Sequence, residues 1–288
     1  MPPIDQPLST FNFQLSTPLQ LLFVHGSGGS ADSWYYQTQA LRGADALTLP
    51  GHAAALARPP SPSSPPIPEQ PCPSVDACAD YLADYIVAKG YSPRSVVTVG
   101  HSLGGAIVMR HALKYPEQLG GIILVGTGAR LRVRPELLAA LEHNYPAAVE
   151  MLLQGYFGAD ADSALVKGTR RKLLRLPNMV TLNDFRLCNE FDIMNEVEKI
   201  ALPALLIFGS GDPLTPPKYG EWLSEHLPDA RLAIVPSEGH MFPLTHATEV
   251  NRLIRGFIQG QEGLATALPT APAAIICHAR NKHESSRI

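Results

Sequence analysis

Short apolar runs alternate with helical periodicities over most of the chain, and this alternation predicts the secondary structure. Runs of apolar and β-branched residues are typical of buried strands in a parallel sheet, and they occur at 19–24, 46–49, 96–99, 121–125, 204–208 and 231–235. Residues 11–15 alternate apolar with polar and predict an edge strand. Helices are expected between these runs, for example over 32–41, 221–227 and 248–258. The pattern predicts an α/β fold with a mostly parallel central sheet flanked by helices.

The alternation stops between residues 128 and 197, where the sequence favours helices alone. Helical spacing of apolar residues predicts elements over 135–153, 163–174 and 181–197. A helical block of this size within an α/β pattern indicates an inserted cap. We therefore expect a core formed by 1–127 and 198–260, a helical cap at 128–197, and a flexible C-terminal tail at 261–288.

Composition narrows the classes of function. The chain of 288 residues has 45% hydrophobic and 17% charged residues and a net charge of −3, which gives no indication of a nucleic-acid partner. The N-terminus has no signal-peptide pattern, and no apolar run is long enough to span a membrane. The cysteines, Cys72, Cys78, Cys188 and Cys277, lack metal-ligand spacing and are expected to be reduced. We expect a cytoplasmic protein that is a monomer or a small homo-oligomer.

A proline-rich segment interrupts the core at 59–73, where eight of fifteen residues are proline. Proline lacks a backbone N–H and fixes its φ angle, so this segment can be neither a helix nor a central strand. We expect an extended surface loop with polyproline character. A ligand for a proline-recognising domain is the alternative.

The segment most suggestive of chemistry is 95–105, S-V-V-T-V-G-H-S-L-G-G. It places Ser102 of a G-x-S-x-G motif between a predicted strand and a predicted helix, which is the context of a nucleophile elbow. A serine hydroxyl needs a base within hydrogen-bonding reach and an acid that orients the base. In an open parallel sheet, such partners follow the carboxyl ends of strands.

Two residues meet this criterion later in the chain. Asp212 follows the strand at 204–208 in a Gly-Ser-Gly-Asp-Pro turn, and His240 follows the strand at 231–235. His101 is expected to point away from the site on the tight turn, and His246 lies a few residues too far along the chain. The order Ser102, Asp212, His240 is that of the Ser-Asp-His triads of α/β hydrolases.

A glycine-rich loop at 25–30, H-G-S-G-G-S, follows the strand at 19–24. Its backbone N–H groups are unobstructed by side chains and suit an anion. The loop lacks the G-K-[ST] of a phosphate-binding loop, so an oxyanion hole is the preferred interpretation over a plain turn.

Taken together, residues 11–260 resemble the α/β-hydrolase superfamily, in the capped group that includes small bacterial carboxylesterases. The resemblance rests on H-G-S-G-G-S (25–30), L-P-G-H (49–52), G-H-S-L-G-G (100–105), G-S-G-D-P (209–213) and E-G-H (238–240). It implies a catalytic triad of Ser102, Asp212 and His240, and an oxyanion hole formed by the backbone N–H groups of Ser27 and Leu103. His25, Gly26 and Gly28 would support the oxyanion loop, with the N–H of Gly28 as a further donor. One departure is the Ala-rich stretch after Gly51-His52, where the family often has G-H-G-x-S.

The function expected from these residues is hydrolysis of small or medium acyl carboxylic esters through an acyl-enzyme on Ser102. No metal and no cofactor is needed. The same triad is compatible with carbon–carbon bond hydrolases, lactonases and thioesterases. A ligand-binding receptor with little turnover is an alternative of another class.

Overall fold

The computed structural model describes residues 19–57, 59, 64–260 and 275–278. Its centre is a seven-stranded sheet in the order β2-β1-β3-β4-β5-β6-β7, in which neighbouring strands are parallel except for the antiparallel pair β6–β7. The strands are β1 (Gln20–Val24), β2 (Ala44–Leu47), β3 (Val96–His101), β4 (Leu119–Val125), β5 (Ala204–Gly211), β6 (Ala230–Glu238) and β7 (Ile275–His278). The predicted mostly parallel sheet is confirmed.

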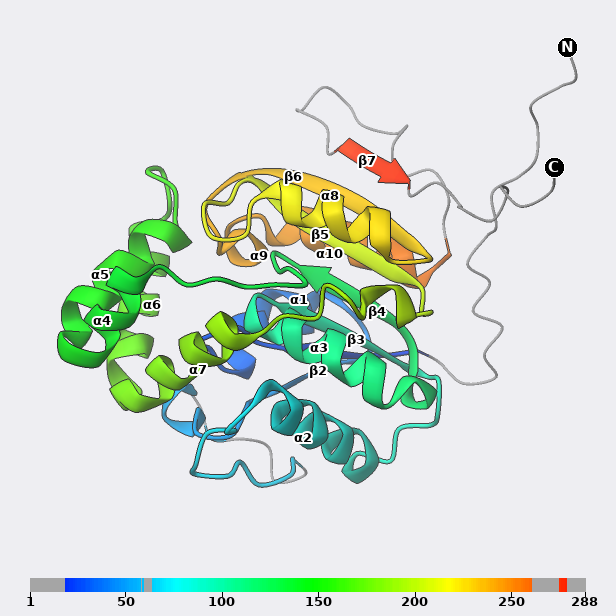
Figure 1. Cartoon of the computed structure of the whole chain (residues 1–288), viewed down its shortest axis with the longest axis horizontal. Coiled ribbons are helices and arrows are strands. Elements are labelled where there is room, and N and C mark those ends of the chain that lie inside the picture. The colour runs from blue at the N-terminus through cyan, green and yellow to red at the C-terminus, as the bar shows by residue number, and fades with distance from the viewer. Residues whose placement is uncertain (1–18, 58, 60–63, 261–274, 279–288) are drawn as a thin grey trace, which may run out of the picture.

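Helices cover both faces of the sheet, as Figure 1 shows. On one face lie α2 (Val75–Ala88), α3 (Leu103–Lys114) and α8 (Pro217–His226), which pack on the alternate strand residues that include Leu22 and Val24. The other face carries α1 (Tyr35–Ala40), α9 (Phe242–Thr245) and α10 (Ala247–Ile258), which pack on the set with Leu21 and Phe23. Because both faces are buried, the strands read as continuous apolar runs. Short 3₁₀ helices occur at Ala31–Trp34, Ala53–Ala55, Pro116–Gln118 and Val197–Lys199.

Local signals account for several element boundaries. The Ser74 hydroxyl accepts the backbone N–H of Ala77 at 3.0 Å and caps α2. Gly90 stops the same helix with a φ of 66°, a conformation that glycine adopts without strain.

Helices α4 (Pro135–His143), α5 (Tyr145–Tyr156), α6 (Ser163–Arg175) and α7 (Asn178–Glu190) lie beside one end of the sheet (Figure 1). They share an apolar cluster that is separate from the two sheet clusters. The single helix expected over 135–153 is in fact two, because Asn144 caps α5 through the N–H of Ala147 and Pro146 cannot continue α4. Likewise, α7 ends earlier than expected, and Asp192 forms an antiparallel bridge with Arg130.

Some predictions fall on segments that the structure does not cover. The expected edge strand at 11–15 lies outside the described residues, as does part of the proline-rich segment; residues 64–73 form no helix or strand. Most of the predicted tail is also outside them, although 275–278 form β7 against β6. Among the described cysteines, Cys72, Cys78 and Cys188 are free and buried.

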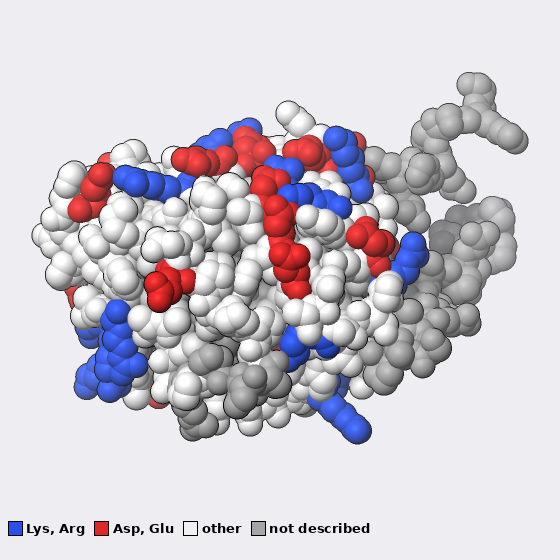
Figure 2. Space-filling model, turned by 90° about the horizontal axis from the view of Figure 1, so that it is seen from below, with Lys and Arg blue, Asp and Glu red and all other residues white. Residues whose placement is uncertain are grey.

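Two further observations concern the whole surface. Acidic and basic side chains are interspersed on the face that Figure 2 shows, and neither sign forms one continuous patch there. In the described part of the chain, none of the helices combines the length and the apolar character needed to cross a bilayer.

Candidate active site

Ser102 lies at the turn between β3 and α3, at the carboxyl edge of the sheet. Its backbone has φ 56° and ψ −120°, a strained conformation for a residue with a side chain. The turn is held from both sides, since the N–H of Ser102 donates to the Val125 carbonyl at 3.1 Å and the Thr127 hydroxyl donates to the Ser102 carbonyl at 2.8 Å. This is the strand–turn–helix geometry of a nucleophile elbow.

The glycines of the motif permit the close approach of β3, α3 and β1. A Cβ atom on Gly100 would overlap the backbone of Gly104, and one on Gly104 would overlap the carbonyl of Val24. The elbow can therefore form only where both positions lack a side chain.

His240 and Asp212 form a buried pair beside Ser102. The Nδ1 atom of His240 lies 2.7 Å from Oδ2 of Asp212, and both residues are at most 3% exposed. The other carboxylate oxygen, Oδ1, accepts the backbone N–H groups of Leu214 and Thr215 at 2.8 and 3.1 Å. The Thr215 hydroxyl donates to Oδ2 at 2.7 Å. The carboxylate is thus fixed by several donors.

These contacts keep Asp212 ionised. Burial alone would raise the pKa of Asp212, but the nearby His240 and the hydrogen bonds from His240 and Thr215 lower it to about 2. The acceptor that faces Nδ1 of His240 is therefore a carboxylate at neutral pH, which assigns a proton to Nδ1 and directs Nε2 away from Asp212.

His101 does not point away from the site, so that prediction was wrong. Its ring packs against the His240 ring with centroids 4.4 Å apart, and its Nε2 donates to the His240 carbonyl at 3.1 Å. Burial, together with the neighbouring His240, lowers the pKa of His101 to about 3, so this ring is neutral. The ring of His101 turns toward the site because the His240 carbonyl accepts its hydrogen bond, and the spacing of residues in the sequence does not show this contact.

The glycine-rich loop after β1 lies opposite this pair. His25 organises it, since its Nδ1 donates to the Gly26 carbonyl at 2.9 Å and its Nε2 accepts the Leu49 N–H at 3.0 Å. The backbone N–H groups of Ser27 and Leu103 have no hydrogen-bond acceptor among the described residues. The N–H of Gly28, by contrast, donates to Oδ2 of Asp184 at 2.8 Å and is not available to a ligand.

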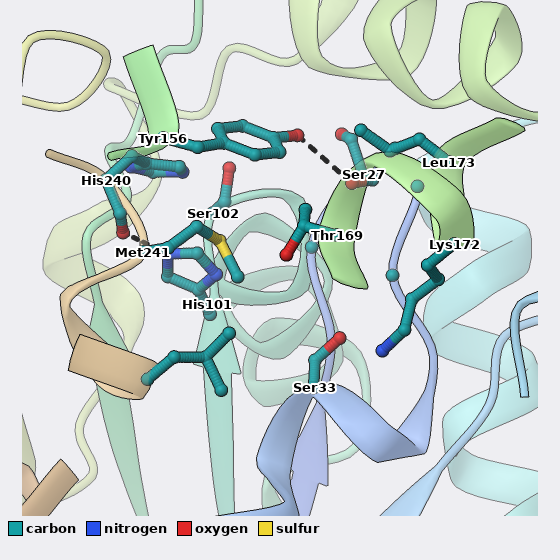
Figure 3. Close-up of a pocket in the computed structure, with 14 residues that line it drawn as sticks. Ser27, Ser33, His101, Ser102, Tyr156, Thr169, Lys172, Leu173, His240 and Met241 are labelled. Carbon is teal, nitrogen blue, oxygen red and sulfur yellow. Dashed lines mark hydrogen bonds between the residues drawn. The ribbon is translucent and has the colours of Figure 1, made fainter. Parts of the chain in front are cut away.

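A small cavity of about 40 Å³ joins these groups. Figure 3 shows Ser102, His240 and Tyr156 gathered on one side of it and Lys172 on the other. The cavity adjoins a larger groove of about 430 Å³, with which it shares Thr169, Lys172 and Leu244. The structure thus brings Ser102 and His240 to one cavity, with the Ser27 loop on its wall.

The residues that sequence reasoning missed come mainly from α6 and α7: Thr169, Lys172 and Asp184, with His52 from the core. Asp184 is 2% exposed although it is charged, and such burial requires a partner. Among these residues, only His52 belongs to a motif that the sequence analysis identified, L-P-G-H. Over the described residues, no group of three or more His, Cys, Asp or Glu side chains is placed to hold a metal ion.

The doubly covered parallel sheet with a serine at the β3–α3 elbow is the architecture of α/β hydrolases. The chain belongs to the alpha/beta hydrolase family, whose model matches residues 21–253. It is accordingly an enzyme of the hydrolase class, and its relatives place it with the esterases.

Among these relatives are bacterial proteins named pimeloyl-(acyl-carrier protein) methyl ester esterase. The one from Neisseria meningitidis serogroup C is 28% identical over 265 residues, which cover 84% of this chain and 94% of that protein. The one from Chromobacterium violaceum is 29% identical over 230 residues, which cover 75% of this chain and 83% of that protein. A solved thermophilic esterase is 33% identical with a TM-score of 0.72, covering 83% of this chain and 89% of its own.

Proposed function

We propose that this enzyme hydrolyses small or medium carboxylic esters through an acyl-enzyme on Ser102. The observation that carries the proposal is the shared cavity, which is lined by a strained elbow serine and by a histidine whose Nδ1 lies 2.7 Å from a buried carboxylate. This combination supports an activated hydroxyl, because a serine alone is a poor nucleophile at neutral pH.

In the proposed reaction, Ser102 Oγ attacks the ester carbonyl while Nε2 of His240 takes the hydroxyl proton. The tetrahedral intermediate collapses, the C–O bond to the alcohol breaks, and His240 protonates the leaving alcohol. A water molecule then attacks the acyl-enzyme while His240 accepts its proton. The bond between the acyl carbon and Ser102 Oγ breaks, the carboxylic acid leaves, and His240 returns the proton to Oγ. Asp212 holds His240 in the required tautomer and stabilises the imidazolium that forms twice in each cycle.

The oxyanion of each intermediate is proposed to bind the N–H groups of Ser27 and Leu103. Ser27 lines the cavity, Leu103 directly follows Ser102, which also lines it, and neither N–H has a protein acceptor among the described residues. A preorganised donor of this kind contributes about 3–4 kcal/mol to the transition state of acyl transfer.

We propose that α4–α7 form the cap that selects the substrate. Tyr156 of α5 and Thr169, Lys172 and Leu173 of α6 line the cavity above Ser102. A cavity of about 40 Å³ accommodates only a small group, whereas the adjoining groove of about 430 Å³ has room for a chain. This division favours esters in which one side of the scissile bond is small.

A carrier-linked methyl ester, as in the names of the Neisseria and Chromobacterium relatives, is a more specific candidate. The groove is lined by Arg171, Lys172 and Arg175 of α6, for which the described residues provide no carboxylate within ion-pair distance. Burial lowers the pKa of Lys172, and the nearby carboxylate of Asp32 opposes that shift. These charges favour an acyl chain or carrier that bears an anionic group.

The first test is hydrolysis of p-nitrophenyl esters of increasing acyl length by the wild type and by Ser102→Ala. We expect turnover of short or medium chains, and a loss of at least about a thousandfold in kcat for the variant. Labelling of Ser102 by a fluorophosphonate is measured in parallel on the same preparations.

The outcomes separate the alternatives. An inert wild type whose Ser102 is labelled would indicate a competent triad acting on another bond, such as a lactone, a thioester or a carbon–carbon bond. A wild type that is inert and unlabelled would contradict the esterase proposal and favour a binding protein.

A further inference from the structure

In one peptide group of the glycine-rich loop, both the N–H and the carbonyl form hydrogen bonds with side chains from the α4–α7 helices. This group joins Ser27 to Gly28. Its N–H donates to Oδ2 of Asp184 on α7 at 2.8 Å, and its carbonyl accepts the Tyr156 hydroxyl of α5 at 3.3 Å. Because a peptide group is planar, fixing its N–H and its carbonyl fixes the orientation of the whole plane.

Asp184 is itself held by the core. The same Oδ2 atom lies 2.9 Å from Nε2 of His52, and both side chains are at most 3% exposed. The other ring nitrogen, Nδ1, lies 2.9 Å from the carbonyl of Pro50, which can only accept. Both nitrogens of His52 therefore face acceptors, an arrangement that suits the imidazolium form, in which the contact with Asp184 is a buried ion pair.

The surroundings of His52 agree with a positive charge. Burial alone would lower the pKa of His52, but the charge of Asp184 and the hydrogen bonds to Asp184 and Pro50 raise it above its ordinary value. The adjacent His25 ring, 4.9 Å away between centroids, has a pKa well below its usual range because of burial and the His52 charge. Because Nδ1 of His25 donates and its Nε2 accepts, this ring is neutral and does not repel a positive charge on His52.

Asp184 does not act alone on α7. One turn further on, the Cys188 thiol lies 3.6 Å from the hydroxyl of Ser27, so both residues on this side of α7 face the same loop. The loop also receives His25 from the core side, as described above. Ser27 is therefore enclosed by α5, α7 and the end of β1.

From this geometry we infer that Asp184 and Tyr156 are positioning residues, which set the orientation of the Ser27 backbone for oxyanion binding. His52 in turn holds Asp184 in place. The inference rests on the proposed ester-hydrolase function. Asp184 does not line the cavity that holds Ser102 and His240; it acts through the Ser27–Gly28 peptide. The α4–α7 helices would then complete the catalytic geometry of the core besides shaping the pocket.

The test compares Asp184→Ala with Asp184→Asn. The alanine variant loses the acceptor for the Gly28 N–H, and we expect kcat for a p-nitrophenyl ester to fall about tenfold to a hundredfold with KM nearly unchanged. Asparagine retains an acceptor oxygen but not the charge, so it should retain kcat within about fivefold of the wild type. Glu190→Ala, an exposed carboxylate on the same helix, is the matched control and should behave as wild type.

Inhibitor binding distinguishes positioning from a general loss of structure. A trifluoromethyl ketone forms an oxyanion adduct with an active serine, whereas the corresponding secondary alcohol does not. We expect Asp184→Ala to weaken the ketone about tenfold or more and to leave the alcohol within twofold. Equal weakening of both ligands would overturn the inference, as would equal kcat in the alanine and asparagine variants.

Tyr156→Phe provides a second variant should Asp184→Ala fail to fold. It removes only the hydroxyl that donates to the Ser27 carbonyl, and at 3.3 Å this contact is the weaker one. We expect a threefold to tenfold loss of ketone affinity, about 0.7–1.4 kcal/mol, that exceeds any loss of alcohol affinity. Wild-type ketone affinity in this variant would contradict the role of Tyr156.

Failure of the proposed function would look different. A wild type that neither hydrolyses esters nor binds the ketone would remove the esterase proposal itself. A wild type that does both, loses both on Ser102→Ala, and is unaffected by Asp184→Ala would leave the esterase proposal intact and overturn only the positioning role.

Discussion

At the scale of single residues, the site is a set of buried polar groups that satisfy one another. Asp212 is surrounded by donors from Leu214, Thr215 and His240. The backbone carbonyl of His240 in turn accepts a hydrogen bond from His101. Each side chain has its protonation state set by the partner it faces, and burial makes an unpaired alternative costly. The same logic governs His52 and Asp184, which lie beside the glycine-rich loop.

The His52–Asp184 pair leads to a pH-dependent stability. Because the folded-state pKa of His52 is raised above its ordinary value of 6.5, the pair contributes fully below that value and is lost as the pH rises through the folded-state pKa. The groups that face this ring are Asp184, His25 and the Cys72 thiol.

We therefore expect His52→Gln to lower the free energy of unfolding most at pH values below 6.5, with the difference from wild type narrowing as the pH rises above that value. Urea unfolding of the wild type and of His52→Gln over this pH range measures the difference in the free energy of unfolding. His143→Gln, on α4, is the control and should show no such narrowing. A difference that widens with pH would contradict the imidazolium assignment.

At the scale of elements, the elbow depends on how closely α3 approaches β1 and β3. The approach is possible because Gly100 and Gly104 present no side chains at the contact. Because α3 packs so close to the sheet, its N-terminus lies beside Ser102, and so does the N–H of Leu103.

Two glycine substitutions should have opposite effects on stability. In Gly104→Ala the new methyl group meets the backbone of β1, so we expect a loss of about 1–3 kcal/mol in the free energy of unfolding. In Gly168→Ala, within α6, no atom lies within 4 Å of the added Cβ, and we expect a gain of about 0.5–1 kcal/mol from helix propensity. Chemical denaturation measures both, and a stabilising Gly104→Ala would contradict the packing argument.

At the scale of the whole molecule, the groove lies between the core and α6. Asp32 and Tyr36 line it from the core, and Arg171, Lys172 and Arg175 line it from α6. The proposed recognition of substrate charge would take place where these two parts of the chain meet, since Lys172 borders both the groove and the cavity.

For this reason Lys172→Met should change the preference for substrate charge. We expect kcat/KM for an ester whose acyl chain ends in a carboxylate to fall about tenfold, while a neutral ester of equal length changes less than threefold. Lys167→Met, exposed on the same helix and outside the groove, is the control. Steady-state kinetics on the two esters measure these changes in kcat/KM. Equal losses of kcat/KM for both esters would exclude charge recognition by Lys172.

Local sequence determined the sheet and the elbow. The runs that form β1, β3, β4, β5 and β6 are apolar because both faces of the sheet are covered, and that pattern can be read without a structure. Gly100, Ser102 and Gly104 act within five residues of one another. Asp212 and His240 were accessible to prediction because the carboxyl ends of parallel strands meet at one edge. Their roles in catalysis stay a prediction.

Only the tertiary structure revealed what encloses the loop after β1. Asp184 is 156 positions away from Gly28 and 132 from His52, and no periodicity links them. The orientation of His101 and the groove lined by Arg171, Lys172 and Arg175 follow likewise from contacts between distant segments. Helical spacing shows which face of α7 is apolar, but a buried carboxylate is explained only by the partners that the fold brings to it.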